Sequence, residues 1–144
     1  MLNPAAEFEY SARVRELFSS LPHAGCLSYA LSASASASAS ASAGSREQGA
    51  SVCLWVQIQG QRVQKARFQA YGCPHFLAAC ETLAAWLEGR AVSEIANWNW
   101  REVETQLQLP AAKRARLLML ADVLSVLDRQ LVGKTSQIRQ APVA

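Results

Sequence analysis

The sequence has no pair of cysteines in the C-x-x-C spacing, although four cysteines lie among its 144 residues: Cys26, Cys53, Cys73 and Cys80. This absence leaves no basis for a zinc ribbon or a ferredoxin site. No apolar run approaches the roughly 20 residues that span a bilayer, and no cationic stretch precedes an apolar segment at the N-terminus, so neither a membrane helix nor a secretory signal is expected. We therefore predict a cytoplasmic protein whose cysteines are thiols, metal ligands or reactive groups, not disulfides.

The sequence also lacks the motifs of common enzyme classes. It has no glycine-rich phosphate loop, no Ser/His/Asp set and no paired carboxylates. The residues that hydrolases and kinases need are therefore missing, and no enzyme is expected. The net charge is only +3, and the basic residues are scattered without stacking aromatics, so nucleic-acid binding is not expected. Hydrophobic residues make up 51% of the chain, which predicts one domain over residues 1–144 with an ordinary core.

Residues 32–43 alternate almost purely between serine and alanine, and a polar stretch follows as far as Gly49. Such a run offers no large side chain to pack. It is therefore predicted to be a flexible surface insertion at about 32–49, and not a strand.

Apolar periodicity predicts helices and strands on both sides of this insertion. Before residue 72 the pattern predicts a helix over 7–20, a short strand over 26–31, and a hairpin of two strands over 52–58 and 63–71. Gly72 and Cys73 then form a tight bend, and Pro74 suits the first turn of a helix that runs to about Glu88. The expected inner face of that helix consists of Phe76, Cys80, Leu83, Ala84 and Leu87.

The remaining segments are predicted to be helical. A helical turn over 93–96, a helix over 99–107 and a long helix from 111 to about 131 are expected, with a frayed tail from about residue 133. The inner face of the long helix is predicted to comprise Leu117, Leu120, Ala121, Leu124, Leu127 and Leu131. The fold class is therefore α+β, a small antiparallel sheet of about three strands with helices packed on one face.

Four short strings occur in an order that is typical of a known family. They are Tyr10-Ser11-x-x-Val14 followed by Pro22 and Gly25, residues 66–73 (Ala-Arg-Phe-Gln-Ala-Tyr-Gly-Cys), residues 86–90 (Trp-Leu-Glu-Gly-Arg) and residues 107–113 (Leu-Gln-Leu-Pro-Ala-Ala-Lys). In this order they resemble the IscU/NifU-type scaffolds of iron–sulfur cluster assembly. The resemblance covers roughly residues 10–131 outside the insertion, and it implies the IscU/NifU N-terminal (SufE-like) fold.

Such scaffolds hold a nascent [2Fe–2S] cluster on soft thiolates from three loops, assisted by an aspartate and a histidine. The resemblance places Cys73 in the second loop and implies that Cys73 binds a cluster, or iron or zinc. In the first loop, Ala50 takes the cysteine position and Val52 the aspartate position. In the third loop, Ala115 and Arg116 occupy the His-Cys positions, and an arginine cannot ligate iron.

The other cysteines and one histidine have structural interpretations beside functional ones. Cys53 is either a strand filler or a relocated ligand, and His75 forms a Cys-x-His pair with Cys73 at a place where the family uses no ligand. Cys80 lies on the apolar helix stripe and is predicted to be core. Cys26 lies away from every matched ligand position and is interpreted as structural.

The resemblance implies two protein partners. A cysteine desulfurase would supply sulfur, and an Hsp70-type chaperone would bind Leu109, Pro110 and Lys113 in the segment that matches its Leu-Pro-x-x-Lys motif. A proline at the start of a helix followed by lysine is also ordinary capping chemistry. Trp98 and Trp100 are expected at a helix joint, one buried and one half-covering it, with a partner surface as the alternative.

Three functions remain open at this stage. The first is a scaffold-like or carrier protein that accepts iron and sulfide at Cys73, with further ligands from Cys53, His75, a second chain in a homodimer or a small thiol. The second is a degenerate paralogue that docks a desulfurase or chaperone without binding a cluster. The third is a persulfide acceptor that uses one cysteine.

Overall fold

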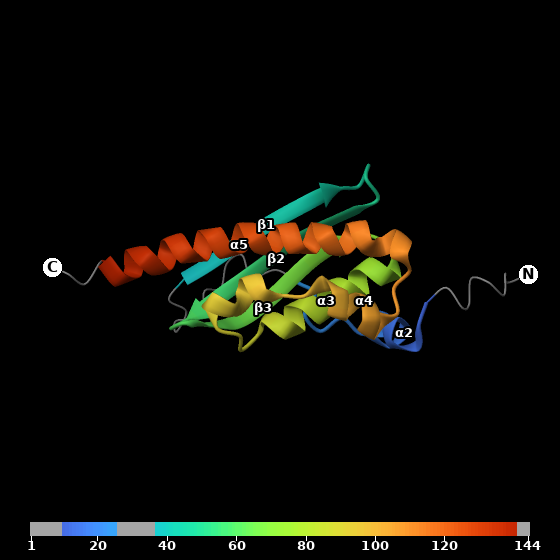
Figure 1. Ribbon diagram of the computed structural model, residues 1–144, viewed down its shortest axis with the longest axis horizontal. Coiled ribbons are helices and arrows are strands. Elements are labelled where there is room, and N and C mark those ends of the chain that lie inside the picture. The colour runs from blue at the N-terminus through green and yellow to red at the C-terminus, as the bar shows by residue number, and fades with distance from the viewer. Residues whose placement is uncertain (1–9, 26–36, 141–144) are drawn as a thin grey trace, which may run out of the picture.

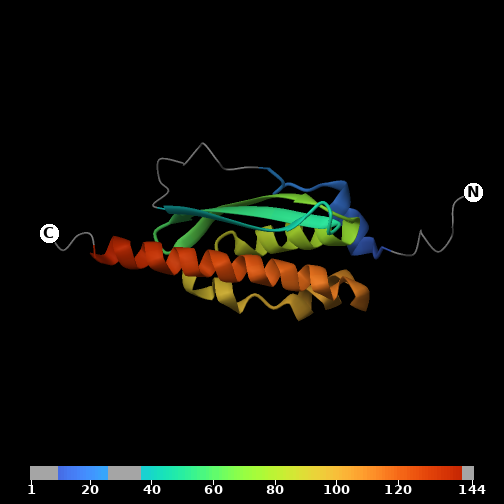
Figure 2. The same cartoon turned by 90° about the horizontal axis from the view of Figure 1, so that it is seen from above.

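The computed structural model describes residues 10–25 and 37–140, with side chains as far as Val132. Its elements are α2 (Ala12–Ser19), β1 (Ala37–Ser45), β2 (Ala50–Gln59), β3 (Arg62–Tyr71), α3 (Pro74–Leu87), η1 (Val92–Asn97), α4 (Trp100–Leu107), η2 (Ala111–Lys113) and α5 (Arg114–Gln140). The strands form an antiparallel sheet in the order β1-β2-β3. Figures 1 and 2 show α3 and α5 together on one face of this sheet, with η1 and α4 beyond them. The predicted α+β architecture is confirmed.

The core lies between the sheet and its helices because every second strand residue faces the helices. Leu54, Val56 and Ile58 of β2 are buried there, as the alternation predicts. The five residues predicted for the inner face of α3 are all buried. On α5 five of the six predicted inner residues are buried, and the sixth, Ala121, is half-buried.

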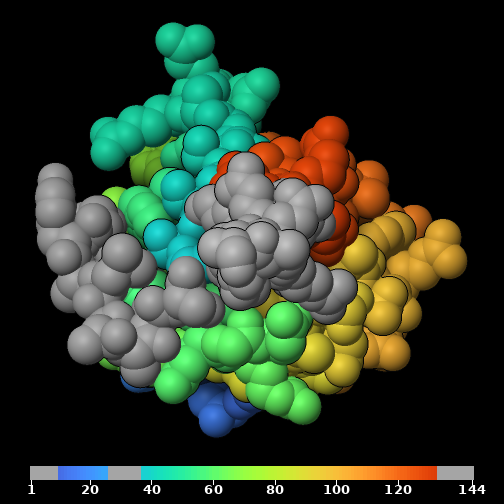
Figure 3. All heavy atoms as spheres, turned by 90° about the vertical axis from the view of Figure 1, so that its left-hand side faces the viewer, coloured from blue at the N-terminus to red at the C-terminus, as the bar shows by residue number. Residues whose placement is uncertain are grey.

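The described part of the chain has no helix that is both long enough and apolar enough to pass through a bilayer. At the end of the sheet shown in Figure 3, the β2–β3 turn lies against the link between α3 and η1. Val63 N donates to Arg90 O at 2.9 Å and Val92 N donates to Gln61 O at 2.8 Å. These backbone hydrogen bonds therefore hold the β2–β3 turn to the link between α3 and η1.

The predicted flexible insertion is wrong for residues 37–45, which form the edge strand β1. Each residue of β1 pairs with β2, and Ala39 and Ala41 are buried toward α5, while Ser40 and Ser42 are exposed. Alternating small residues fit a strand because pairing needs only the backbone, and α5 supplies the apolar cover that the strand lacks. Gln130 of α5 also donates through Nε2 to Ser40 O at 3.0 Å. The predicted strand at 26–31 and the start of the insertion lie outside the described residues.

The last helix is longer than predicted, since α5 continues as helix to Gln140, and fraying of its end remains a prediction. Residues 134–140 contain neither proline nor glycine and include lysine, glutamine and arginine, which are good helix formers. One glycine, Gly133, is therefore not enough to end the helix.

Gly44 near the end of β1 is required by the backbone. Its φ is +81°, and a Cβ at this position would lie 2.2 Å from Ala50 O of the paired strand. Gly44→Ala is therefore expected to lower the free energy of unfolding by about 2 kcal/mol in urea denaturation. Gly60→Ala is the matched control, because φ is +63° there but nothing lies within 4 Å. An equal loss in both variants would show that the contact with Ala50 O is not the cause.

His23 fastens the segment after α2 to the rest of the domain. Its backbone joins β3, where Phe68 N donates to His23 O at 3.0 Å. Its own N–H donates to Glu81 Oε1 at 2.9 Å, and the two ring nitrogens contact the carboxylates of Glu81 and Glu88, the latter at 2.8 Å. The segment is thus held to both the sheet and α3.

Glu88 takes part in this network from the end of α3. Partial burial alone would raise the pKa of Glu88, but hydrogen bonds from Ala66 N–H, His23 and Arg67 outweigh that effect and lower the pKa below its usual value. Glu88 is therefore held as a carboxylate that links β3, α3 and the segment around His23.

Candidate functional site

Three segments of the chain lie at one end of the sheet. They are the β1–β2 turn at residues 46–49, the bend at 72–73 after β3, and the start of α5. Ser51 pairs with Tyr71 across β2 and β3, which brings the beginning of β2 beside the end of β3. Arg116 of α5 donates through Nη2 to Gln48 O in the β1–β2 turn at 2.9 Å. The three loops that the resemblance implies are therefore brought together.

Cys73 belongs to the second of these three segments along the chain, directly before α3. It is the N-cap of the helix, Pro74 follows it, and Leu77 N donates to Cys73 O at 3.1 Å. Cys73 is half-buried against the core, so its thiol lies at the boundary between core and solvent. Gly72 allows the bend because a Cβ there would lie 2.8 Å from the ring of Phe76.

The first-loop positions have become part of the hydrophobic core. Ala50 is 0% exposed and Val52 is 3% exposed, and both face the helices with Leu54. Neither side chain can ligate a metal ion. The structure thus places apolar side chains at the two positions for which the resemblance implies a cysteine and an aspartate.

The third-loop positions carry no ligand either. Ala115 is exposed, and Arg116 is half-buried with its guanidinium on the β1–β2 turn. Gly49 leaves room for it, since a Cβ at that residue would lie 3.3 Å from Arg116 Nη2. A permanent cation therefore occupies this part of the site.

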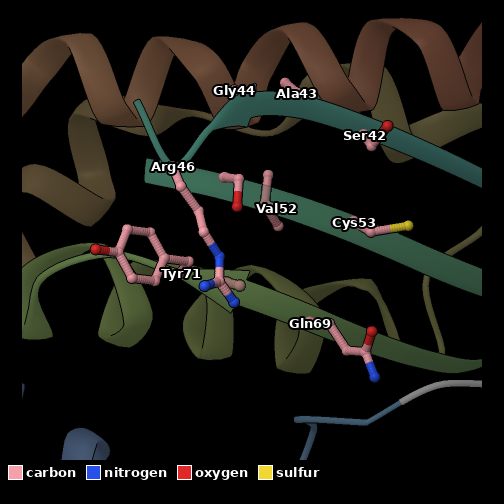
Figure 4. Close-up of a pocket in the computed structure, with 10 residues that line it drawn as sticks. Ser42, Ala43, Gly44, Arg46, Val52, Cys53, Gln69 and Tyr71 are labelled. Atoms are coloured by element: carbon pink, nitrogen blue, oxygen red, sulfur yellow. The ribbon is translucent and has the colours of Figure 1, made fainter. Parts of the chain in front are cut away.

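Cys53 lies on the opposite face of the sheet from Ala50 and Val52. It lines a surface hollow of about 350 Å³ together with Gln69 and Tyr71 of β3. Figure 4 shows these three side chains. The guanidinium of Arg46 lies over the Tyr71 ring in the same hollow, 5.2 Å from the ring centroid. Because the outer face of the sheet is separate from the face that carries Ala50, this position favours the strand-filler interpretation of Cys53.

The other sulfur and imidazole candidates have core positions. Cys80 is buried as predicted, and burial raises the pKa of its thiol far above the usual value. His75 is buried in α3, and its ring packs against Tyr10 with centroids 4.6 Å apart. Cys26 lies outside the described residues.

The residues with the predicted chaperone motif form the connection between α4 and α5. Leu109 is buried, Pro110 is exposed and precedes η2, and Lys113 N donates to Pro110 O at 2.9 Å. These positions fit a structural role, and chaperone binding remains a prediction. Trp98 is buried and Trp100 is half-buried against the core, as expected for a helix joint.

Within residues 10–25 and 37–132 no three histidine, cysteine or acidic side chains are grouped to hold a metal ion. Ala50, Val52, Ala115 and Arg116 stand at the other ligand positions that the resemblance implies, and none of them can ligate iron. The described residues of a single chain therefore do not fit a [2Fe–2S] cluster.

Sequence reasoning did not find the contacts made by Arg116 and His23. Arg116 is 68 residues from Gln48, and His23 is 58 residues from Glu81. No local spacing pattern can report such pairs.

The described residues form an α+β domain with a cysteine at the start of α3. The chain belongs to the NifU-like N terminal domain family, whose family model matches residues 9–130. No curated protein matches the chain.

Two solved structures share the fold. The N-terminal part of a nitrogen-fixing NifU-like protein from Brucella abortus is 17% identical with a TM-score of 0.63, covering 86% of this chain and 94% of that one. A putative iron–sulfur cluster assembly scaffold protein for the SUF system from Fervidobacterium islandicum AW-1 is 14% identical with a TM-score of 0.53, covering 83% and 85%. At these identities the similarity shows the fold alone.

Proposed function

We propose that this chain works in iron–sulfur cluster assembly in the cytoplasm, as a scaffold-like or carrier protein that accepts its cargo on the thiolate of Cys73. The observation that carries the proposal is the position of Cys73 at the start of α3, half-buried where three loops converge, in a member of the NifU-like family. A cysteine desulfurase is the proposed sulfur donor. The protein would bind and hand on cargo and would not itself catalyse a reaction.

The cargo on Cys73 depends on what completes the site. A cluster, or a single iron or zinc ion, needs more ligands than the described residues of one chain offer. Such ligands would have to come from a second copy of the chain in a homodimer or from a small thiol.

A second candidate, a persulfide acceptor, is favoured by the same shortage of ligands. The Cys73 thiolate would attack the outer sulfur of a persulfide on the desulfurase cysteine, and the bond between the donor's two sulfurs would break. The donor leaves as a thiolate, and Cys73 gains one sulfur as a persulfide without net oxidation. This exchange needs only one well-placed thiol.

The test is the amount of iron and acid-labile sulfide per chain, after purification and reconstitution without oxygen. Cys73→Ser is compared with wild type and with Cys53→Ser. We expect the cargo of the wild type to be lost in Cys73→Ser and kept in Cys53→Ser. Iron and acid-labile sulfide in near-equal amounts would identify a cluster. Sulfur without iron that only a thiol reductant releases as sulfide would identify a persulfide on Cys73.

Two results would contradict the proposal. One is cargo that survives Cys73→Ser, since Cys73 would then not be the acceptor. The other is a wild type that takes up neither iron nor sulfur, which would leave only docking of a desulfurase, or of a chaperone at Leu109, Pro110 and Lys113.

A further inference from the structure

The end of the domain that carries Cys73 is held together without metal ligands from its first and third loops. Ala50 and Val52 belong to the core, and the third loop offers Arg116. A metal ion next to a guanidinium would be repelled, and a fully buried alanine offers it no electron pair. Neither loop therefore offers a metal ligand at these positions.

Arg116 joins the two chain segments that carry the first-loop and third-loop positions. Its Nη2 donates to Gln48 O at 2.9 Å, which ties the β1–β2 turn to the first turns of α5. Its neighbour Arg114 does not compete for that position, because it bonds Glu104 through Nε at 2.7 Å. The turn is also braced internally by Gly49 N, which donates to Arg46 O at 3.0 Å.

We propose that Arg116 acts as a built-in cation that replaces a metal ion in linking the β1–β2 turn to α5. It is a positioning residue, since it orders the loops beside Cys73 and does not itself accept cargo. The proposal stands whichever cargo Cys73 carries, because it concerns only how the other two loops are held.

The first test is hydrogen–deuterium exchange at the Gln48 and Gly49 amides, which are hydrogen-bonded within the turn. Arg116→Ala is expected to speed exchange roughly 3- to 10-fold, because an exposed hydrogen bond from a charged group is lost. Arg116→Lys should restore part of the protection, and Arg114→Ala should leave it unchanged. Unchanged exchange in Arg116→Ala would overturn the proposal.

The second test asks whether a metal can take the place of the arginine. The double variant Ala50→Cys/Arg116→Cys returns two thiols to the first and third loops, with Cys73 still present. Its turn amides are expected to exchange fast without zinc and roughly tenfold more slowly with zinc, whereas zinc leaves the wild type unchanged.

Two comparisons make this second test specific. Adding Cys73→Ser to the double variant should weaken the zinc response, which a purely structural effect of the substitutions would not do. Circular dichroism checks that the variants are folded, and Arg116→Cys alone serves where the double variant does not fold. Zinc protection of the wild-type turn that depends on Cys73, or a double variant with no zinc response, would contradict the proposal.

Discussion

Cys73→Ser is expected to abolish the transfer of sulfur from a cysteine desulfurase to this chain, whereas the wild type gains the mass of one sulfur atom. Cys73 is half-buried at the start of α3. Cys80 cannot substitute, since it is buried and its pKa is raised far above the usual value, so it stays a thiol and a thiol is a poor nucleophile. Intact-protein mass spectrometry after incubation with desulfurase and cysteine measures the gain.

Cys53→Ser is the matched control for this experiment. Cys53 is also half-buried, but it lies on the outer face of the sheet. The variant should accept sulfur as the wild type does, and a reductant should remove the added mass from both. Sulfur transfer that survives Cys73→Ser and disappears in Cys53→Ser would move the acceptor to the outer face of the sheet.

Glu81→Ala is expected to lower the free energy of unfolding by about 3–4 kcal/mol, because it removes one partner of a buried polar network. Glu81 is 3% exposed, accepts the backbone N–H of His23 at 2.9 Å and contacts its ring. Without the carboxylate, the segment around His23 loses both of its contacts with Glu81, and the contact of its ring with Glu88 remains. Urea denaturation followed by circular dichroism measures the change.

Glu94→Ala is the comparison for an exposed pair. Glu94 Oε2 lies 3.7 Å from Arg90 Nη1, and the Glu94 side chain is about half exposed. Its removal should therefore lower the free energy of unfolding by about 0.5 kcal/mol or less. Glu81→Gln keeps an acceptor for the His23 N–H and should fall between wild type and Glu81→Ala. Equal losses for Glu81→Ala and Glu94→Ala would show that the His23 network does not stabilise the fold.

The hairpin and the helix after it were predictable because local chemistry determines them. Alternation over β2 and β3 reports a sheet with one buried face, and Pro74 marks the start of α3. β1 was not predictable, since alternating serine and alanine has the same appearance in a strand and in a flexible linker. Pairing with β2 and packing against α5 make this segment a strand, and both of these elements come later in the chain.

In the candidate site, too, features set by neighbouring residues were predictable, and contacts between distant residues were not. The place of Cys73 follows from the local string Gly-Cys-Pro at residues 72–74. That Arg116 cannot ligate iron also follows from its chemistry alone. The hydrogen bond from Arg116 to Gln48 O could not be predicted in this way, because it depends on how α5 lies against the β1–β2 turn.

The Ser-Ala repeat of β1 has a unit of two residues, which equals the side-chain period of a strand. Gaining or losing one whole unit slides the strand along β2 and returns an alanine to each place under α5. Gaining or losing a single residue instead turns serines toward the core and alanines toward solvent. We therefore expect the fold to tolerate an even change in the length of the repeat and to be destabilised by an odd one.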